Sequence, residues 1–244
     1  MKTVIVIPVR MAASRFPNKP MALIDGTPMI VHVWQRAVES NLGRVVVACC
    51  DKDVKDCIES NGGYVVLTNP DLPSGTDRVY EAIENDEEFS ISDNIINLQG
   101  DMPLINKNSI ESVIEPLIQG YDMSTLATSF LSDNEKSSQN ITKVRIQWIK
   151  KEIMGEAVDF NKNIDEIGKK DVYHHLGIYG FKPSALKQFV KLPVSKREKK
   201  LKLEQMRAID NNISIGINYV KDSLLGVDTM DDLNIVEKII KDKK

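Results

Sequence analysis

Residues 3–20 read TVIVIPVRMAASRFPNKP, an apolar run followed by a basic loop. The continuous apolar run over residues 3–9 predicts a buried parallel strand, because such strands are covered on both faces. The loop places Arg10, Arg15 and Lys19 among small residues and prolines. Backbone N–H groups and guanidinium forks in such a loop suit phosphate oxygens, and prolines stiffen it before an anion binds. The alternative is a basic turn that faces solvent.

The rest of the first half alternates strands and helices. Strands are expected over residues 3–9, 44–50, 64–67, 94–99 and 122–129, and helices over 28–40, 51–61, 74–85 and 106–119. Asp51 is the expected N-cap of the second helix, Gly62 and Gly63 its end, and Pro116 lies in the last turn of the fourth. This alternation predicts a parallel sheet with helices on both faces, and ligands bind beyond the carboxyl ends of its strands.

The second half is less regular. A hairpin is expected over residues 144–149 and 152–158, an irregular arm or lid over 160–170, strands over 173–181 and 213–219, and helices over 195–210 and 230–241. There is no internal repeat and no low-complexity linker. We interpret this half as an insertion into and completion of one domain, with a patch left for a partner subunit.

Composition limits the possible functions. A chain of 244 residues can bury a full core, and a formal net charge of −3 argues against a general nucleic-acid binder. Cys49, Cys50 and Cys57 lack metal-ligand spacing, so reduced thiols in a cytosolic protein are expected. The sequence shows no signal peptide and no apolar run of membrane-spanning length, so no membrane association is expected.

Two motifs offer carboxylates at loop positions. Asp101 follows the strand in NLQGDMPL (residues 97–104), where Gly100 permits a tight turn at the carboxyl edge of the sheet. Asp228 lies in GVDTMDDL (226–233), just before a helix that Thr229 would cap, with Asp231 and Asp232 in its first turn. Few protein carboxylates together with substrate phosphates suit Mg²⁺. The alternative for each aspartate is a turn or cap role.

Three further motifs are weaker when each is taken alone. PSGTDR (73–78) opens a helix that Ser74 would cap, with Arg78 facing a nucleotide. HHLGIYGF (174–181) places His175, Gly177 and Tyr179 on one face of a strand and leaves His174 as a surface histidine. In LEQMR (203–207), Glu204 and Gln205 would diverge on a helix surface.

Together these motifs resemble the CMP-Kdo synthetases, the 3-deoxy-manno-octulosonate (Kdo) cytidylyltransferases. The matching segments, in order, are IPVRMAASRFPNKPM, PMIVHVWQRA, SGTDR, NLQGDMPLI, HHLGIYGF, LEQMRA and GVDTMDDL. The resemblance implies an α/β fold: a Rossmann-like nucleotidyltransferase, three-layer α/β/α with a mainly parallel mixed sheet and an inserted dimerisation region. It implies a single domain, with a nucleotide-binding core over about 1–130 and 205–244 and a sugar-binding and dimerisation region over about 131–204. It also implies CTP as nucleotide, Mg²⁺, a homodimer and a cytoplasmic role in lipopolysaccharide inner-core synthesis.

The resemblance also implies roles for individual residues. Those expected at the CTP are Arg10, Ser14, Arg15, Lys19, Ser74, Arg78 and Gln99. Asp101 and Asp228 would hold Mg²⁺, and Arg15, Lys19 and Asp101 are the expected catalytic residues. Those expected at the sugar acid are Lys162, His175, Tyr179, Glu204 and Gln205.

The sequence departs from the family at two places. Met102 replaces a glutamate, and FNKNI (160–164) replaces a Phe-Ser-Arg segment, so that Lys162 stands for the arginine. A lysine is a point charge, whereas arginine binds a carboxylate with two parallel hydrogen bonds. The expected reaction is cytidylyl transfer to Kdo; the alternatives are transfer to another acid, of the amino-Kdo or sialic type, and a catalytically silent nucleotide-binding paralogue. A dehydrogenase is disfavoured, because no G-x-G-x-x-G follows the first strand.

Overall fold

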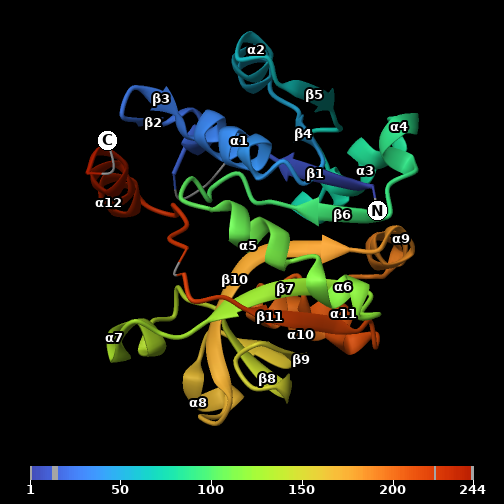
Figure 1. Cartoon of the computed structure of the whole chain (residues 1–244), viewed down its shortest axis with the longest axis vertical. Helices are drawn as coiled ribbons and strands as arrows, with labels where there is room; N and C mark the ends of the chain where they lie inside the picture. The colour runs from blue at the N-terminus through green and yellow to red at the C-terminus, as the bar shows by residue number, and fades with distance from the viewer. Residues whose placement is uncertain (1, 13–15, 223, 243–244) are drawn as a thin grey trace. The chain divides into compact units, whose positions relative to one another are not determined.

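The computed structural model describes residues 2–12, 16–222 and 224–242. The chain divides into two compact units, Met1–Ile110 with Leu224–Lys244, and Glu111–Ser223 (Figure 1). The functional division expected near residues 131 and 204 stays a prediction. Within the described ranges, no helix has both the length and the apolar character needed to cross a membrane.

The first unit contains a parallel sheet. Its strands are β1 (Thr3–Pro8), β4 (Arg44–Cys49), β5 (Tyr64–Leu67) and β6 (Asn94–Asn97), in the order β5-β4-β1-β6. The central strand β1 is almost fully buried from Val4 onward, as its continuous apolar sequence predicts. The parallel sheet expected for the first half is confirmed for these four strands, whereas the fifth expected strand, over residues 122–129, forms in the second unit and has one antiparallel neighbour.

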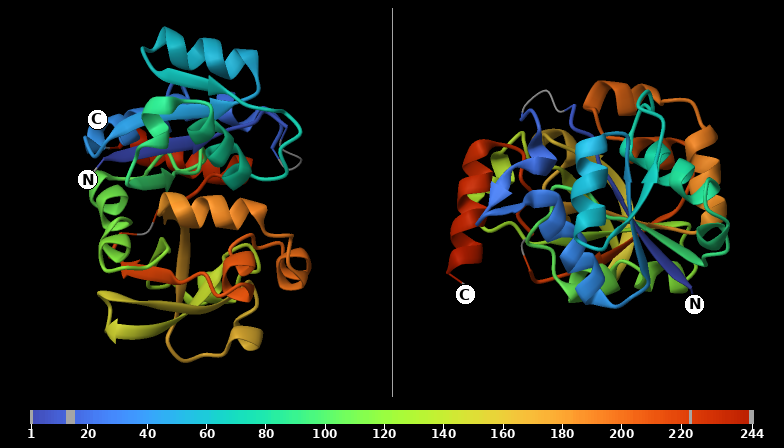
Figure 2. Two further views of the ribbon diagram at one scale, coloured as in Figure 1. Left: turned by 90° about the vertical axis from the view of Figure 1, so that its right-hand side faces the viewer. Right: turned by 90° about the horizontal axis from the view of Figure 1, so that it is seen from above.

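Helices cover both faces of this sheet. The helices here are α1 (Met29–Ser40), α2 (Lys52–Ser60), α3 (Gly75–Glu84) and α4 (Glu87–Ser90), with a short 3₁₀ turn, η1 (Lys19–Met21). Helices α1 and α2 pack together on one face, and α3 lies on the other (Figure 2), as right-handed crossovers require. Ser74 caps α3 by accepting the Asp77 N–H, so the predicted cap is confirmed.

The expected helix over residues 106–119 is wrong. The chain instead forms α5 (Lys107–Ser112) and α6 (Glu115–Ile118), and Pro116 lies in the first turn of α6. Proline lacks an N–H and fixes φ, so it fits a first turn but removes a hydrogen bond from a helix interior. The break before Pro116 follows from that restriction.

The C-terminal helix packs on the N-terminal part of the first unit. Helix α12 (Met230–Lys241) lies beside the small hairpin of β2 (Leu23–Ile24) and β3 (Thr27–Pro28) in Figure 1. Ile24 and Val227 are fully buried in one apolar cluster with side chains of α1 and α12. The Asp25 N–H donates to Glu237 Oε1 at 3.1 Å, across 212 residues. This packing carries residues 224–229 to the loop that follows β1.

The second unit contains a mixed sheet. Its strands are β7 (Met123–Thr128), β8 (Lys143–Lys150), β9 (Met154–Asn161), β10 (Val172–Phe181) and β11 (Ile215–Tyr219), in the order β10-β7-β11-β9-β8, with β10 also paired to β8. Only β7 and β11 run parallel, and the other pairs are antiparallel. The predicted β8–β9 hairpin is confirmed. The expected mainly parallel sheet therefore holds for the first unit only, because a short hairpin connection imposes an antiparallel pair.

The remaining helices are short. They are α7 (Asp133–Ser137), α8 (Ile164–Ile167), α9 (Pro183–Lys191), α10 (Lys196–Leu201) and α11 (Met206–Asp210). The single helix expected over residues 195–210 is wrong, because Lys202 adopts a left-handed conformation with φ of 55° and separates α10 from α11. The segment 160–170, expected to be irregular, includes the end of β9 and all of α8.

Candidate active site

The first unit holds a pocket of about 340 Å³ beyond the carboxyl ends of β1 and β6, at the N-terminus of α3. This is the edge at which ligands bind to parallel sheets. It brings together most of the residues predicted for nucleotide and metal, namely Arg10, Lys19, Ser74, Arg78, Gln99, Asp101 and Asp228. The other two predicted nucleotide residues, Ser14 and Arg15, lie outside the described residues.

Lys19 joins the two predicted metal ligands. Its Nζ donates to Asp101 Oδ2 at 2.7 Å and to the Val227 carbonyl at 2.8 Å, and it lies 3.7 Å from Asp228 Oδ1. Two carboxylates thus meet at one cation at the mouth of a pocket. Lys19 was predicted to contact phosphate, and in this structure its partners are the carboxylates and a carbonyl.

The donor set at this place fits Mg²⁺. The carboxylates of Asp101 and Asp228 are hard oxygen ligands that retain partial exposure to water, and an ammonium already stands between them. Among the described residues, no group of three or more His, Cys, Asp and Glu side chains is arranged to hold a metal ion. A pair of carboxylates suits Mg²⁺, which keeps several waters and takes substrate phosphates as ligands.

Asp228 is not the cap of α12. Thr229 is the N-cap: its hydroxyl accepts the Asp232 N–H, and Asp232 in turn accepts the Thr229 N–H at 2.8 Å. The Asp228 N–H also donates to Asp232 Oδ2, at 3.0 Å. The first-turn role predicted for Asp232 is confirmed, and Asp228 lies one residue earlier with its carboxylate toward Lys19.

The other side of the pocket is preorganised. The Arg78 guanidinium is only 2% exposed and donates to Thr68 Oγ1, while Gln99 donates to Asn97 Oδ1 at 2.7 Å. Arg10 is exposed. Gly100 is needed where the two strand ends approach, because a Cβ there would stand 2.6 Å from a methyl carbon of Val9.

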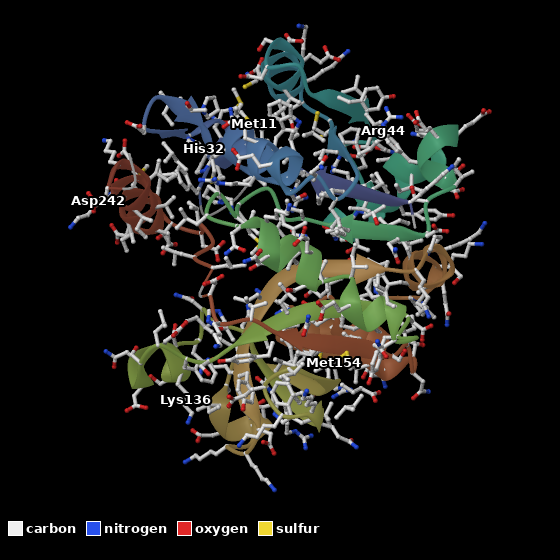
Figure 3. The ribbon with its side chains drawn as sticks, viewed as in Figure 1. Met11, His32, Arg44, Lys136, Met154 and Asp242 are labelled. Carbon is white, nitrogen blue, oxygen red and sulfur yellow. The ribbon has the colours of Figure 1, made fainter. Side chains whose placement is uncertain are left out.

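Asp51 has a role that the sequence did not reveal. It occupies the N-cap position of α2 but makes no capping hydrogen bond with its side chain, so the predicted cap is wrong. Its Oδ2 instead accepts the N–H of Met11, labelled in Figure 3, at 2.9 Å. Asp51 therefore anchors the first residues of the cationic loop to the neighbouring strand end. The only hint in the sequence was an acidic residue directly after a parallel strand.

The second unit brings His175 and Tyr179 together. The two ring centroids are 5.5 Å apart, although the register of β10 against β7 shifts between Leu176 and Tyr179. His175 Nε2 lies 3.0 Å from Thr125 Oγ1. Burial lowers the pKa of His175 to about 3, and burial followed by the charge of Glu204 raises the pKa of Tyr179. At neutral pH both side chains are therefore uncharged.

His174 is not the surface histidine that the alternation predicted. Its Nδ1 lies 2.6 Å from Glu135 Oε1, its ring stacks on Phe130, and its side chain is 16% exposed. Strand β8, which pairs with β10 here, and Glu135 of α7 cover His174. A side chain that points away from His175 on the strand is therefore still largely buried.

The other predicted acid-binding residues lie at turns. Glu204 and Gln205 occupy the turn between α10 and α11, and Gln205 is buried at the start of α11, so the divergent helix positions predicted for them are wrong. Lys162 directly follows β9, and its carbonyl accepts a hydrogen bond from Lys143.

A cationic loop after the first strand of a parallel sheet, with two carboxylates at the same edge, is typical of the nucleotide-binding α/β transferases. The sequence model of the family described as cytidylyltransferase matches residues 4–215. The chain is 40% identical over 239 residues to a 3-deoxy-manno-octulosonate cytidylyltransferase of Paramagnetospirillum magneticum, covering 98% of this chain and 97% of the relative. It is 42% identical to the enzyme of the same name from Parvibaculum lavamentivorans, covering 94% and 89%.

Solved structures agree with these relatives. A structure of CMP:2-keto-3-deoxy-manno-octonic acid synthetase complexed with CTP matches with a TM-score of 0.89 and 31% identity, covering 100% of both chains. A cytidylyltransferase from Leptospira borgpetersenii matches with a TM-score of 0.63 and 16% identity, which shows the shared fold alone. The chain belongs to the cytidylyltransferase family and, within it, to the CMP-Kdo synthetases.

Proposed function

We propose that this protein transfers CMP from CTP to the anomeric hydroxyl of Kdo, giving CMP-Kdo and pyrophosphate. The observation that carries the proposal is the meeting of Lys19, Asp101 and Asp228 in the pocket after β1. Full-length relatives named for this reaction, and a matching structure complexed with CTP, support the same assignment.

In this reaction the sugar hydroxyl attacks the α-phosphorus in line and pyrophosphate leaves. Such transfers depend mainly on positioning and on neutralisation of charge. Arg10, exposed at the pocket, and Lys19 would bind the phosphates and stabilise the departing pyrophosphate. Arg78 and Gln99, fixed by Thr68 and Asn97, would orient the nucleotide. Ser14 and Arg15 stay predictions for the same task.

Asp101 and Asp228 would hold Mg²⁺, which when bound would neutralise phosphate charge and lower the pKa of the attacking hydroxyl. The Lys19 ammonium is already paired with both carboxylates. Lys19 would exchange these partners for phosphate oxygens when nucleotide binds, because two of the three donors of its ammonium already bond to Asp101 and to the Val227 carbonyl.

We assign the sugar acid to residues of the second unit. Neutral His175 and protonated Tyr179 can donate hydrogen bonds to sugar hydroxyls without adding charge. Glu204 and Gln205 supply acceptors at the turn before α11. Lys162 would meet the carboxylate of the acid as a point charge.

A pyrophosphate-release assay tests the proposal. The protein is given CTP, ATP, GTP or UTP with Kdo, and then CTP with a panel of sugar acids. Rapid release with CTP and Kdo alone is the expected result. Preference for an amino-substituted or sialic-type acid would contradict the choice of Kdo, and Lys162 in place of an arginine is the observation that favours this alternative. CTP binding without turnover of any acid would indicate a silent paralogue.

We further propose that two copies associate and that the enzyme acts in the cytoplasm, for lipopolysaccharide inner-core synthesis. Exposed apolar side chains on the β8–β9 hairpin support a dimer: Ile149 is 68% exposed and Ile153 is 44% exposed. Light scattering on the purified protein would give twice the chain mass. A monomer at micromolar concentration would contradict the dimer.

A further inference from the structure

Lys143 on β8 is a fully buried lysine, 0% exposed. Its Nζ donates to three backbone carbonyls, those of Ser138, Ile141 at 3.0 Å and Lys162 at 2.7 Å. An ammonium has three donors, so these three carbonyls satisfy it completely. Burial lowers the pKa of Lys143, and the charge of Glu135 opposes that shift. Burying a charged lysine costs folding free energy, so a buried lysine at this position requires an explanation.

The strand register places Lys143 between the two acid-binding strands. Its paired residues are Asn161 on β9 and His174 on β10. The residues that follow them are Lys162 and His175, both assigned to the sugar acid. Thr142, the residue before Lys143, also contacts β10, because its carbonyl accepts a hydrogen bond from the His175 N–H at 2.9 Å.

The segment around Lys162 is shaped by the pairing of β9 with β8 and by local side-chain hydrogen bonds. Asn161 Oδ1 accepts the Asn163 N–H at 2.9 Å, and Asn163 caps α8 through the Asp165 N–H. These bonds shape the turn on either side of Lys162. The bond from Lys143 reaches the Lys162 carbonyl from a different strand.

We infer that Lys143 is a positioning residue for the acceptor acid, fixing the main chain from which Lys162 meets the substrate carboxylate. This inference rests on the proposed function. Because Lys162 offers a point charge rather than a planar fork, its contribution depends strongly on where its backbone is held. A lysine with a purely structural role would change stability without distinguishing the two substrates.

The test is a double-mutant cycle with Lys143→Met, Lys162→Met and the double variant. Each single variant is expected to raise the KM for the acid about tenfold while the KM for CTP changes less than about twofold. If Lys143 acts through Lys162, the double variant raises the KM for the acid little further, because coupled residues are not additive. Lys182→Met is the matched control, since Lys182 Nζ donates to the Gly120 carbonyl at 2.6 Å at the protein surface and both KM values should stay unchanged.

An unchanged KM for the acid in Lys143→Met would overturn the inference. So would a double variant whose KM for the acid rises by the product of the two single effects. Equal rises of the KM for the acid and the KM for CTP in Lys143→Met would overturn it as well. If Lys143→Met does not fold, Lys143→Arg decides by the same comparison, because it keeps the cation but changes the geometry of its donors. Wild-type protein that binds CTP but turns over no acid would refute the proposed function instead, and this inference would fall with it.

Discussion

Replacing Glu198 by Gln should destabilise the second unit more than any surface charge change. Glu198 and Arg207 form a buried pair, with Nε to Oε2 at 2.9 Å and Nη2 to Oε1 at 2.6 Å, and their side chains are 9% and 4% exposed. The Arg207 guanidinium also lies 4.7 Å from the ring centroid of Phe189. Gln keeps the capping-box hydrogen bonds that Glu198 makes with Ser195, so the substitution removes mainly the charge.

The magnitude follows from burial. Removing one partner of a buried pair costs about 3–5 kcal/mol, because the other charge loses its close counter-ion. Gln retains one hydrogen bond to Arg207, and Glu204 Oε1 lies 4.0 Å from Arg207 Nη2, so we take the lower end, about 3 kcal/mol. For a chain of this size, 1 kcal/mol shifts Tm by about 2–4 °C, which gives a fall of about 6–12 °C.

Thermal unfolding followed by circular dichroism measures this shift. Arg197→Gln is the matched control on the same helix, because Arg197 is 45% exposed in its pairs with Asp159 and Asp210 and should contribute less than about 1 kcal/mol. A Tm within about 2 °C of wild type for Glu198→Gln would refute the reasoning. The KM for the acid should also rise, since the pair closes the turn that carries Glu204 and Gln205.

Two further predictions concern CTP binding by the first unit and the pH dependence of stability in the second. Asp51→Ala should raise the Kd for CTP about tenfold, because the Met11 N–H loses a charged acceptor. Asp51→Asn keeps an acceptor oxygen and should raise the Kd less. Calorimetry that gives Asp51→Ala the same CTP affinity as wild type would contradict this prediction. The pKa of His175 lies at about 3, below its ordinary 6.5, so as pH falls the unfolded chain binds the proton first. Stability should fall below pH 6.5 by up to about 1.4 kcal/mol per pH unit, and urea unfolding between pH 6.5 and 5 should show a flatter slope for His175→Gln.

Features of the site that depend on local chemistry could be predicted from the sequence. The apolar run before Arg10 predicts β1, and the Thr229 cap predicts the start of α12. Asp101 was predicted at the carboxyl edge of the sheet because a parallel strand ends there, and the expected cap at Thr229 left Asp228 as a candidate ligand. The shared metal site of the two aspartates came from the family resemblance.

Features that depend on contacts between distant segments could not be predicted in this way. No glycine or proline marks the break at Lys202; the buried pair of Glu198 and Arg207 accompanies the turn there, and that pairing is tertiary. Asp51 looked like a cap because its partner, Met11, is 40 residues away. Lys143 stands just before the strand expected over residues 144–149, and nothing in its neighbourhood in the sequence indicates that it is buried.

The most direct test of the central claim is the initial rate of pyrophosphate release from CTP and Kdo with Mg²⁺, compared between wild type and Asp101→Asn. The matched control is Asp231→Asn, an exposed aspartate in the first turn of α12. We predict rapid release by wild type and the control, and a loss of about 10²–10³-fold in Asp101→Asn, because a carboxylate that would hold the charge-neutralising Mg²⁺ is removed. Full Mg²⁺-dependent release by Asp101→Asn would contradict the assignment of the active site.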